Sequence, residues 1–165
     1  MMTDEVYNYL KAIVRRRKKV GIYAGSFFPF HLGHLNILRK AEKMFDKVIV
    51  AVGLNPQKEY KGNYHNVPNI LPHHQVDYYA GQLVEYVNSK RDECDPVLIR
   101  GLRDGYDLAQ EINLARFLDE QAVARRIERI PITYISSDRE FEHISSSAIR
   151  SLMPEDAKRY IPERQ

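Results

Sequence analysis

The stretch VGIYAGSFFPFHLGH, residues 20–34, decides the fold. Its first part, Val20 to Ala24, is apolar and rich in residues that favour strands, so it predicts a buried strand. Gly25 and Ser26 follow at once, and a segment with helical spacing of its apolar residues begins at His31 to His34. A strand that passes through a glycine turn into a helix is typical of an α/β unit, and the free N–H groups of such a helix start favour an anion.

Further runs of the same kind follow along the chain. The strands that we expect after the first are Val48–Val52, Val76–Tyr79, Val97–Ile99 and Ile132–Ile135. The apolar helix faces that we expect between them are Leu35, Leu38, Ala41, Met44 and Phe45, then Leu83, Val84 and Val87, then Leu108, Ile112, Ala115 and Leu118. Most of these strands lack a polar alternate, which indicates parallel strands covered on both sides. The sequence therefore predicts a Rossmann-like α/β fold with a five-stranded parallel sheet, helices on both faces, and ligands at the carboxyl ends of the strands.

The domain organisation follows from the ends of this pattern. Residues 3–19 have the spacing of an amphipathic helix, so residues 1–19 are interpreted as a helical extension and residues 20–165 as one domain. The segment from Lys61 to His74 holds two prolines, one glycine and three asparagines and is expected to be a loop.

Composition excludes several classes of protein. Hydrophobic residues make up 44% of the 165 residues and charged residues 28%, as in ordinary globular domains. No apolar stretch is long enough to span a membrane, and Cys94 is the one cysteine, so we expect a cytoplasmic protein without disulfides. The net charge of +3 permits anionic ligands but does not argue for nucleic acid. The run Arg15 to Lys19 is interpreted as a solvated helix end; the alternative is a surface for RNA or another anion.

Phosphate chemistry is the function that the turn after the first strand favours. His31 and His34 lie three residues apart around a glycine, so both imidazoles can point into one crevice. A zinc site is the alternative, but no carboxylate or thiolate accompanies the pair as a third ligand. Arg100 and Arg103 follow the fourth strand and can bind phosphate oxygens with their forked guanidinium groups.

Three motifs together resemble a known family. They are Gly25 to His34 at the first turn, Leu98 to Arg103 with Asp107 and Glu111 on the next helix, and Ile144 to Arg150 near the carboxyl terminus. The chain resembles the nucleotidyltransferases with the HIGH-type motif, and the second motif is similar to that of the pantetheine-phosphate adenylyltransferases in particular.

The resemblance implies adenylyl transfer from ATP, with Mg²⁺ on the triphosphate, to 4′-phosphopantetheine in coenzyme A synthesis. His34, Lys58 and Arg100 would be catalytic. Residues that would bind ATP are Gly25, Ser26, Phe27, His31, Gly33, His34, Gly101, Leu102, Arg103, Asp107, Glu111, Phe141, Ile144, Ser145, Ser146 and Ser147. Residues that would bind the acceptor are Ser26, Lys58, Leu83, Val84 and Arg100. The resemblance also implies a homo-oligomer, often a hexamer in that family, and no protein ligand for a metal.

Two positions depart from the family pattern. Phe28 stands where the family has an aspartate, and Leu118 stands where it has an asparagine that contacts the acceptor. The alternative acceptor is a nicotinate or nicotinamide mononucleotide, because Pro29 to His31 and the ending Ser147 to Arg150 resemble the enzymes that use it, and another nucleotidyltransferase of the same superfamily also stays open. A nucleotide-binding regulator without turnover, which Phe28 and the basic end of the first helix favour, is the alternative from another class.

Overall fold

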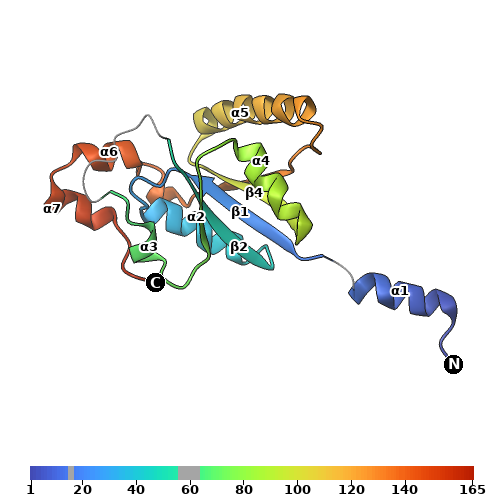
Figure 1. Ribbon diagram of the computed structural model, residues 1–165. Helices are drawn as coiled ribbons and strands as arrows, with labels where there is room; N and C mark the ends of the chain where they lie inside the picture. The colour runs from blue at the N-terminus through green and yellow to red at the C-terminus, as the bar shows by residue number, and fades with distance from the viewer. Residues whose placement is uncertain (15–16, 56–63) are drawn as a thin grey trace.

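The computed structural model describes residues 1–14, 17–55 and 64–165 (Figure 1). Its centre is a five-stranded sheet in the order β3-β2-β1-β4-β5. The strands are β1 (Lys19–Gly25), β2 (Lys47–Gly53), β3 (Val76–Tyr79), β4 (Asp95–Leu102) and β5 (Ile132–Ser136). Every neighbouring pair is parallel, so the sheet confirms the prediction. The order in which the strands are added reverses at the boundary between β1 and β4, and sheets of this kind bind ligands at the carboxyl ends of the strands beside such a boundary.

The helices of the described residues are α1 (Asp4–Val14), α2 (Leu32–Glu42), α3 (Val67–Ile70), α4 (Leu83–Ser89), α5 (Gly105–Ala124), α6 (Ser146–Ser151) and α7 (Pro154–Ala157). Helices among them cover both faces of the sheet, as the apolar strands predict. Short 3-10 turns lie at Lys90–Asp92, Arg139–Phe141 and Lys158–Tyr160. One hydrophobic cluster joins α2 and α3 to the sheet, and a second joins α4 and α5 to the other face.

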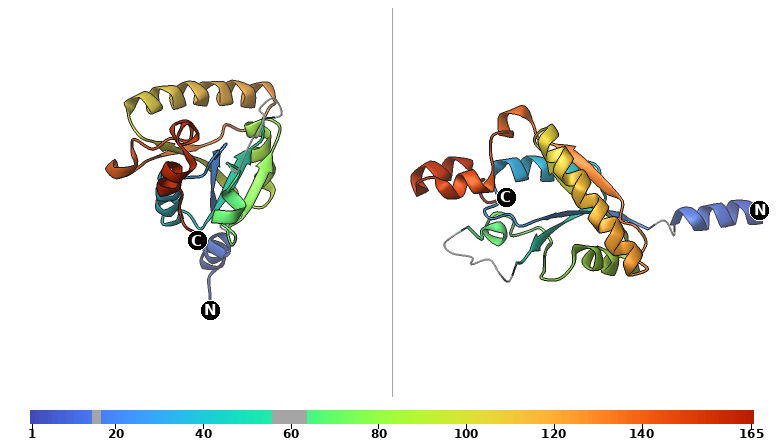
Figure 2. Two further views of the ribbon diagram at one scale, coloured as in Figure 1. Left: turned by 90° about the vertical axis from the view of Figure 1, so that its left-hand side faces the viewer. Right: turned by 90° about the horizontal axis from the view of Figure 1, so that it is seen from above.

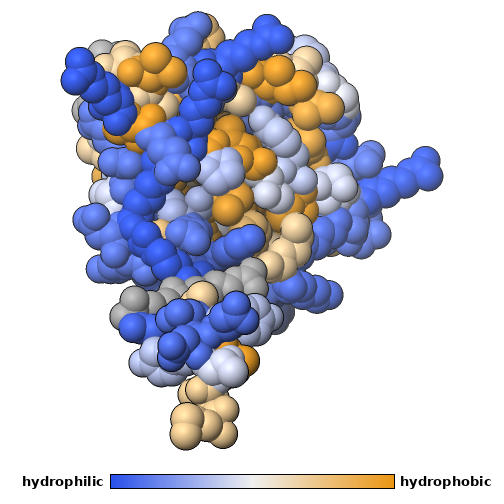
Figure 3. Space-filling view, turned by 90° about the vertical axis from the view of Figure 1, so that its right-hand side faces the viewer, coloured by the Kyte–Doolittle hydropathy of each residue, from blue (hydrophilic) through white to orange (hydrophobic). Residues whose placement is uncertain are grey.

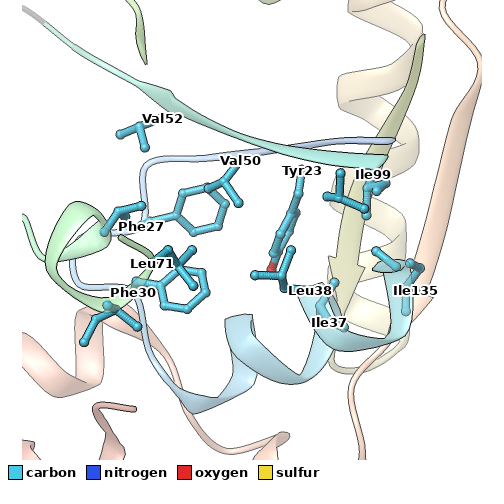
Figure 4. Close-up of a cluster of buried hydrophobic side chains, with 14 residues drawn as sticks. Tyr23, Phe27, Phe30, Ile37, Leu38, Val50, Val52, Leu71, Ile99 and Ile135 are labelled. Atoms are coloured by element: carbon cyan, nitrogen blue, oxygen red, sulfur yellow. The ribbon is translucent and has the colours of Figure 1, made fainter. Parts of the chain in front are cut away.

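The first cluster fixes the loop that follows β1. Phe27 and Phe30 of this loop are buried together with Tyr23 of β1 and Leu38 of α2 (Figure 4). The rings of Tyr23 and Phe27 meet edge to face at 4.9 Å between centroids. Burial of such aromatic side chains stabilises a fold by about 1.5–3 kcal/mol each, so the loop belongs to the core.

Several local expectations were wrong. Part of the segment expected to be a loop is helix α3, which has Pro68 in its first turn, a place where proline costs no hydrogen bond. Met44 is exposed because α2 ends at Glu42. Leu108 and Ile112 are exposed as well. In the first two turns of α5, Asp107 and Glu111 face Arg103 and Arg100, so the neighbouring side chains of Leu108 and Ile112 face solvent.

Helix α1 extends away from the rest of the molecule (Figure 1 and the right-hand view of Figure 2). The helix ends at Val14 and β1 begins at Lys19, so the helix expected over residues 3–19 is shorter. Its apolar residues Val6, Leu10 and Ile13 are exposed. Figure 3 shows the face of the molecule from which α1 extends, where hydrophobic residues reach the surface in several places between hydrophilic ones.

Candidate active site

A cavity of about 300 Å³ opens at the carboxyl ends of β1 and β4, between the start of α2 and the start of α6. It gathers most of the residues that the sequence singles out. These are Gly25, Ser26, Phe27, His31, Gly33, His34, Arg100, Gly101, Leu102, Arg103, Asp107, Glu111, Phe141, Ile144, Ser145 and Ser146. Three motifs far apart in the sequence therefore line one space.

The two histidines hold each other in a capping box at the start of α2. His31 is the N-cap, and its Nδ1 accepts hydrogen bonds from the backbone N–H groups of Gly33 at 3.1 Å and His34 at 3.4 Å. In return, His34 Nδ1 accepts one from the backbone N–H of His31 at 3.1 Å. Because both Nδ1 atoms accept, each neutral ring carries its proton on Nε2. The cavity is thus lined by two imidazoles whose Nε2–H groups are donors.

Burial keeps both rings neutral. Burial, helped by the nearby Arg103 guanidinium, lowers the pKa of His31 to about 4. The same desolvation, with His31 and Arg103 adding to it, lowers the pKa of His34 well below its ordinary value. The rings stack with centroids 3.7 Å apart, which also disfavours two positive charges. At neutral pH the pair therefore offers hydrogen-bond donors and no acidic imidazolium.

A side chain at Gly33, between the two histidines, would crowd the ring of His31. A Cβ on Gly33 would lie 3.0 Å from Cε1 and 3.1 Å from Nδ1 of the His31 ring.

Phe27, earlier in the loop, has φ 45°, a conformation that non-glycine residues adopt rarely. Tight loop geometry of this kind is common at functional sites.

Arg100 is fixed by a carboxylate of α5. Its Nε and Nη2 each donate to a carboxylate oxygen of Glu111 at 2.8 Å, and its Nη1 donates to the carbonyl of Ala24 at 2.9 Å. These bonds use three of the five N–H donors of the guanidinium group. The pair with Glu111 raises the pKa of Arg100, so the side chain stays charged despite its burial. Its remaining donors suit a phosphate held at this end of the sheet.

Arg103 is held in the same way one turn nearer the start of α5. Its Nε and Nη2 donate to Asp107 at 2.9 and 3.1 Å, and its backbone N–H donates to the same carboxylate at 2.9 Å. The Arg103 guanidinium and these hydrogen bonds lower the pKa of Asp107. Asp104 caps α5 by accepting from the backbone N–H of Asp107 at 2.9 Å. The carboxylates Asp107 and Glu111 thus each orient one arginine.

The serines at the start of α6 have separate tasks. Ser145 is the N-cap and accepts from the backbone N–H of Ala148 at 3.1 Å. Ser146 donates to the carbonyl of Pro29 at 2.8 Å, which ties α6 to the loop after β1. Ser147 does not line the cavity; its hydroxyl oxygen accepts from Arg150 at 3.4 Å.

The residues expected to bind the acceptor are only partly brought together. Ser26 and Arg100 line the cavity. Val84 and Leu83 belong to α4. Val84 is fully buried in the hydrophobic cluster that α4 and α5 form with the sheet, Leu83 packs against that cluster, and neither residue lines the cavity. Leu118 is buried in that core too. Lys58 lies outside the described residues.

Sequence reasoning missed four residues that line the cavity, namely Tyr23, Ala24, Ile37 and Ser137. Ser137 directly follows β5, so the rule that sites gather at strand ends could have found it. Its Oγ is buried and has no hydrogen-bond partner within the described part of the chain. The signal for Ile37 was weaker, since an apolar helix residue reads as core.

The described residues contain no group of three or more histidine, cysteine or acidic side chains able to hold a metal ion. Within the same ranges, no helix is long and apolar enough to cross a membrane.

A parallel sheet of this order, with neutral imidazole donors, two oriented arginines and a helix start around one cavity, is the kind of site that binds phosphate groups. The sequence profile of the family described as cytidylyltransferase-like matches residues 22–152. The chain belongs to this family and is a nucleotidyltransferase.

Relatives agree with this assignment, and a solved structure shares the fold. The phosphopantetheine adenylyltransferase of Fusobacterium nucleatum is 32% identical over 81% of this chain and 82% of its own length. The enzyme of the same name from Alkaliphilus metalliredigens is 29% identical over 88% of this chain and 93% of its own. Among solved structures, the nicotinic acid mononucleotide adenylyltransferase of Plasmodium falciparum, complexed with APC, has a TM-score of 0.56 at 17% identity, covering 87% of this chain and 90% of that one. The last comparison supports the fold.

Proposed function

We propose that the protein transfers the adenylyl group of ATP to 4′-phosphopantetheine, giving dephospho-coenzyme A and pyrophosphate. The observation that carries the proposal is the pair of neutral histidines, each with its Nδ1 accepting a backbone hydrogen bond, which line the same cavity as Arg100 and Arg103. Relatives named phosphopantetheine adenylyltransferase, about 30% identical over most of the chain, support the choice of acceptor.

The reaction needs alignment and charge stabilisation more than a covalent residue. An oxygen of the acceptor phosphate attacks the α-phosphorus of ATP, and the bond from that phosphorus to the bridging oxygen of pyrophosphate breaks, with the electron pair leaving on pyrophosphate. The phosphate oxygen is already a nucleophile, so two anions must be brought into line and negative charge on the transferring group must be stabilised.

In this proposal the chain's own groups divide that task. His34 Nε2–H donates to an oxygen of the α-phosphate, where negative charge grows in the transition state, and His31 lies along the triphosphate. Arg100, pinned by Glu111, meets the acceptor phosphate with its remaining donors. Arg103 and the N–H groups at the start of α6 lie along the triphosphate.

Magnesium fits this site as part of the ATP complex. The carboxylates closest to the cavity, Asp107 and Glu111, are paired with arginines, whereas phosphate oxygens and water are the ligands that Mg²⁺ prefers. The ion would neutralise charge on the triphosphate.

The test is turnover with defined acceptors. Purified protein is incubated with ATP, Mg²⁺ and 4′-phosphopantetheine, nicotinate mononucleotide or nicotinamide mononucleotide, and pyrophosphate and the mass of the nucleotide product are measured. We expect pyrophosphate and dephospho-coenzyme A with the first acceptor. Product with a mononucleotide alone would overturn the proposed acceptor, and tight ATP binding without product from any acceptor would overturn the proposed activity.

A further inference from the structure

Asn66 sits at a helix start and does not cap it. Asparagine is among the best N-cap residues, and Asn66 occupies the N-cap of α3, yet its side chain makes no capping hydrogen bond. Instead it reaches across the fold to the loop after β1. Its Oδ1 accepts from the backbone N–H of Phe30 at 2.8 Å, and its Nδ2 donates to the carbonyl of Phe30 at 3.0 Å. The side chain is buried, so water does not compete for these bonds.

The carbonyl that Asn66 binds belongs to the peptide group between Phe30 and His31, whose N–H donates a hydrogen bond to the histidine pair. The carbonyl of Phe30 and the N–H of His31 lie in one planar unit and point in opposite directions. Asn66 holds the carbonyl, and the N–H donates to Nδ1 of His34 at 3.1 Å. The orientation of this peptide therefore sets whether His34 Nδ1 has a donor, and so where the ring keeps its proton. A donor on the carbonyl also strengthens the N–H at the other end of the unit.

We propose that Asn66 is a positioning residue for adenylyl transfer, acting through the Phe30–His31 peptide to hold His34 with its Nε2–H toward the cavity. As a statement about catalysis, this inference rests on the proposed function. The statement about the histidine pair can be tested without it.

The preceding residues are held from a different element. Ser146 of α6 donates to the carbonyl of Pro29 at 2.8 Å, and Arg150 donates to the carbonyl of Phe28 at 2.5 Å. The two hydrogen bonds from α6 fix the course of the loop, whereas Asn66 fixes the plane of the peptide group between Phe30 and His31. Losing Asn66 should therefore disturb the imidazoles more than the loop.

The first test is Asn66→Ala, with Arg91→Ala as the matched control. Arg91 binds the carbonyls of Glu128 at 2.9 Å and Arg129 at 3.0 Å, near the amino ends of β4 and β5, so its loss also removes two side-chain bonds to backbone. We expect Asn66→Ala to lower kcat by about 10- to 100-fold with KM for ATP changed by less than about threefold, since a small misplacement of a catalytic group costs this much. Arg91→Ala should lower stability and leave kcat per folded molecule unchanged. An equal effect of both variants on kcat would overturn the proposal.

The second test uses the acid form of an aspartate. In Asn66→Asp a protonated carboxyl can accept from the Phe30 N–H and donate to its carbonyl, as the amide does, whereas the carboxylate has no donor. We expect the ratio of variant to wild-type kcat to rise as the pH falls from 8 to 5. His65, His31, His34, Arg150 and the substrate phosphates are present with both proteins, so the ratio at each pH removes what they contribute in common. A ratio that does not change with pH would contradict the proposal.

A spectroscopic measurement tests whether Asn66 determines which ring nitrogen of His34 carries the proton, and it does not depend on turnover. Long-range ¹H–¹⁵N NMR spectra of the imidazoles report which ring nitrogen carries the proton. We expect His34 to be protonated on Nε2 in the wild type and in Arg91→Ala, and to lose this single form in Asn66→Ala. An unchanged His34 pattern in Asn66→Ala would overturn the positioning role, while absence of turnover in the wild type would overturn the proposed function instead.

Discussion

The two ends of the sheet use arginine in different ways. At the carboxyl end, Arg100 and Arg103 are each paired with a carboxylate of α5 and line the cavity. At the amino end, Arg91 binds the carbonyls of Glu128 at 2.9 Å and Arg129 at 3.0 Å. Pairing with a carboxylate orients a guanidinium group and leaves donors for a ligand, whereas bonds to backbone commit it to holding the chain. Substitutions at the carboxyl end should therefore change turnover, and those at the amino end should change stability.

The largest effect that we expect at the carboxyl end comes from His34. His34→Ala should lower kcat for pyrophosphate release by about 100- to 1,000-fold, the usual cost of removing one donor to a developing negative charge. His34→Asn should lose a similar factor, because its carbonyl oxygen can still accept from the His31 N–H but it lacks the ring Nε2–H. Steady-state kinetics on folded protein, checked by circular dichroism, measures both. Wild-type turnover in either variant would contradict the role of this imidazole.

The sequence predicted most of the carboxyl end because its signals are local. Short runs of residues that favour strands, most of them apolar on both faces, predicted all five strands, and the glycine turn before His31 and His34 marked the site. The side of α5 that faces the sheet was harder to predict. The spacing of Leu108 and Ile112 indicates core positions, but in the structure Asp107 and Glu111 face the arginines and these two apolar residues are exposed. Asn66 could not be found this way, because its partner Phe30 lies 36 residues away and the segment that holds Asn66 was expected to be a loop.

The next effect concerns stability and pH. In the folded protein the pKa of His31 is about 4, below its ordinary 6.5, so between these values the unfolded chain binds a proton that the folded chain does not. The free energy of unfolding should therefore fall as the pH drops from 6.5 to 4, by about 3 kcal/mol for this residue. The lowered pKa of His34 acts in the same direction.

Urea denaturation at pH 7, 5.5 and 4 measures this slope. His31→Asn keeps a good N-cap residue but has no group that titrates there, so its stability should change less over the same interval. The amino-end variant Arg91→Ala should keep the full wild-type slope at a lower stability. A slope of the same size in His31→Asn would show that other groups cause it.

The smallest effect separates the two arginines by the substrate that each one serves. Glu111→Gln and Asp107→Asn each replace a carboxylate by an amide of the same shape, so the arginine remains but loses its charged, two-pronged partner. Arg100 lies beside Ala24 at the end of β1, and Arg103 lies toward the histidines whose pKa values it lowers. We expect Glu111→Gln to raise KM for the acceptor by about 10-fold and Asp107→Asn to raise KM for ATP by about threefold, since the second pair is the more exposed one. If both variants raised KM for the same substrate, the two arginines would serve one phosphate chain, and the division of the cavity into an acceptor side and an ATP side would be wrong.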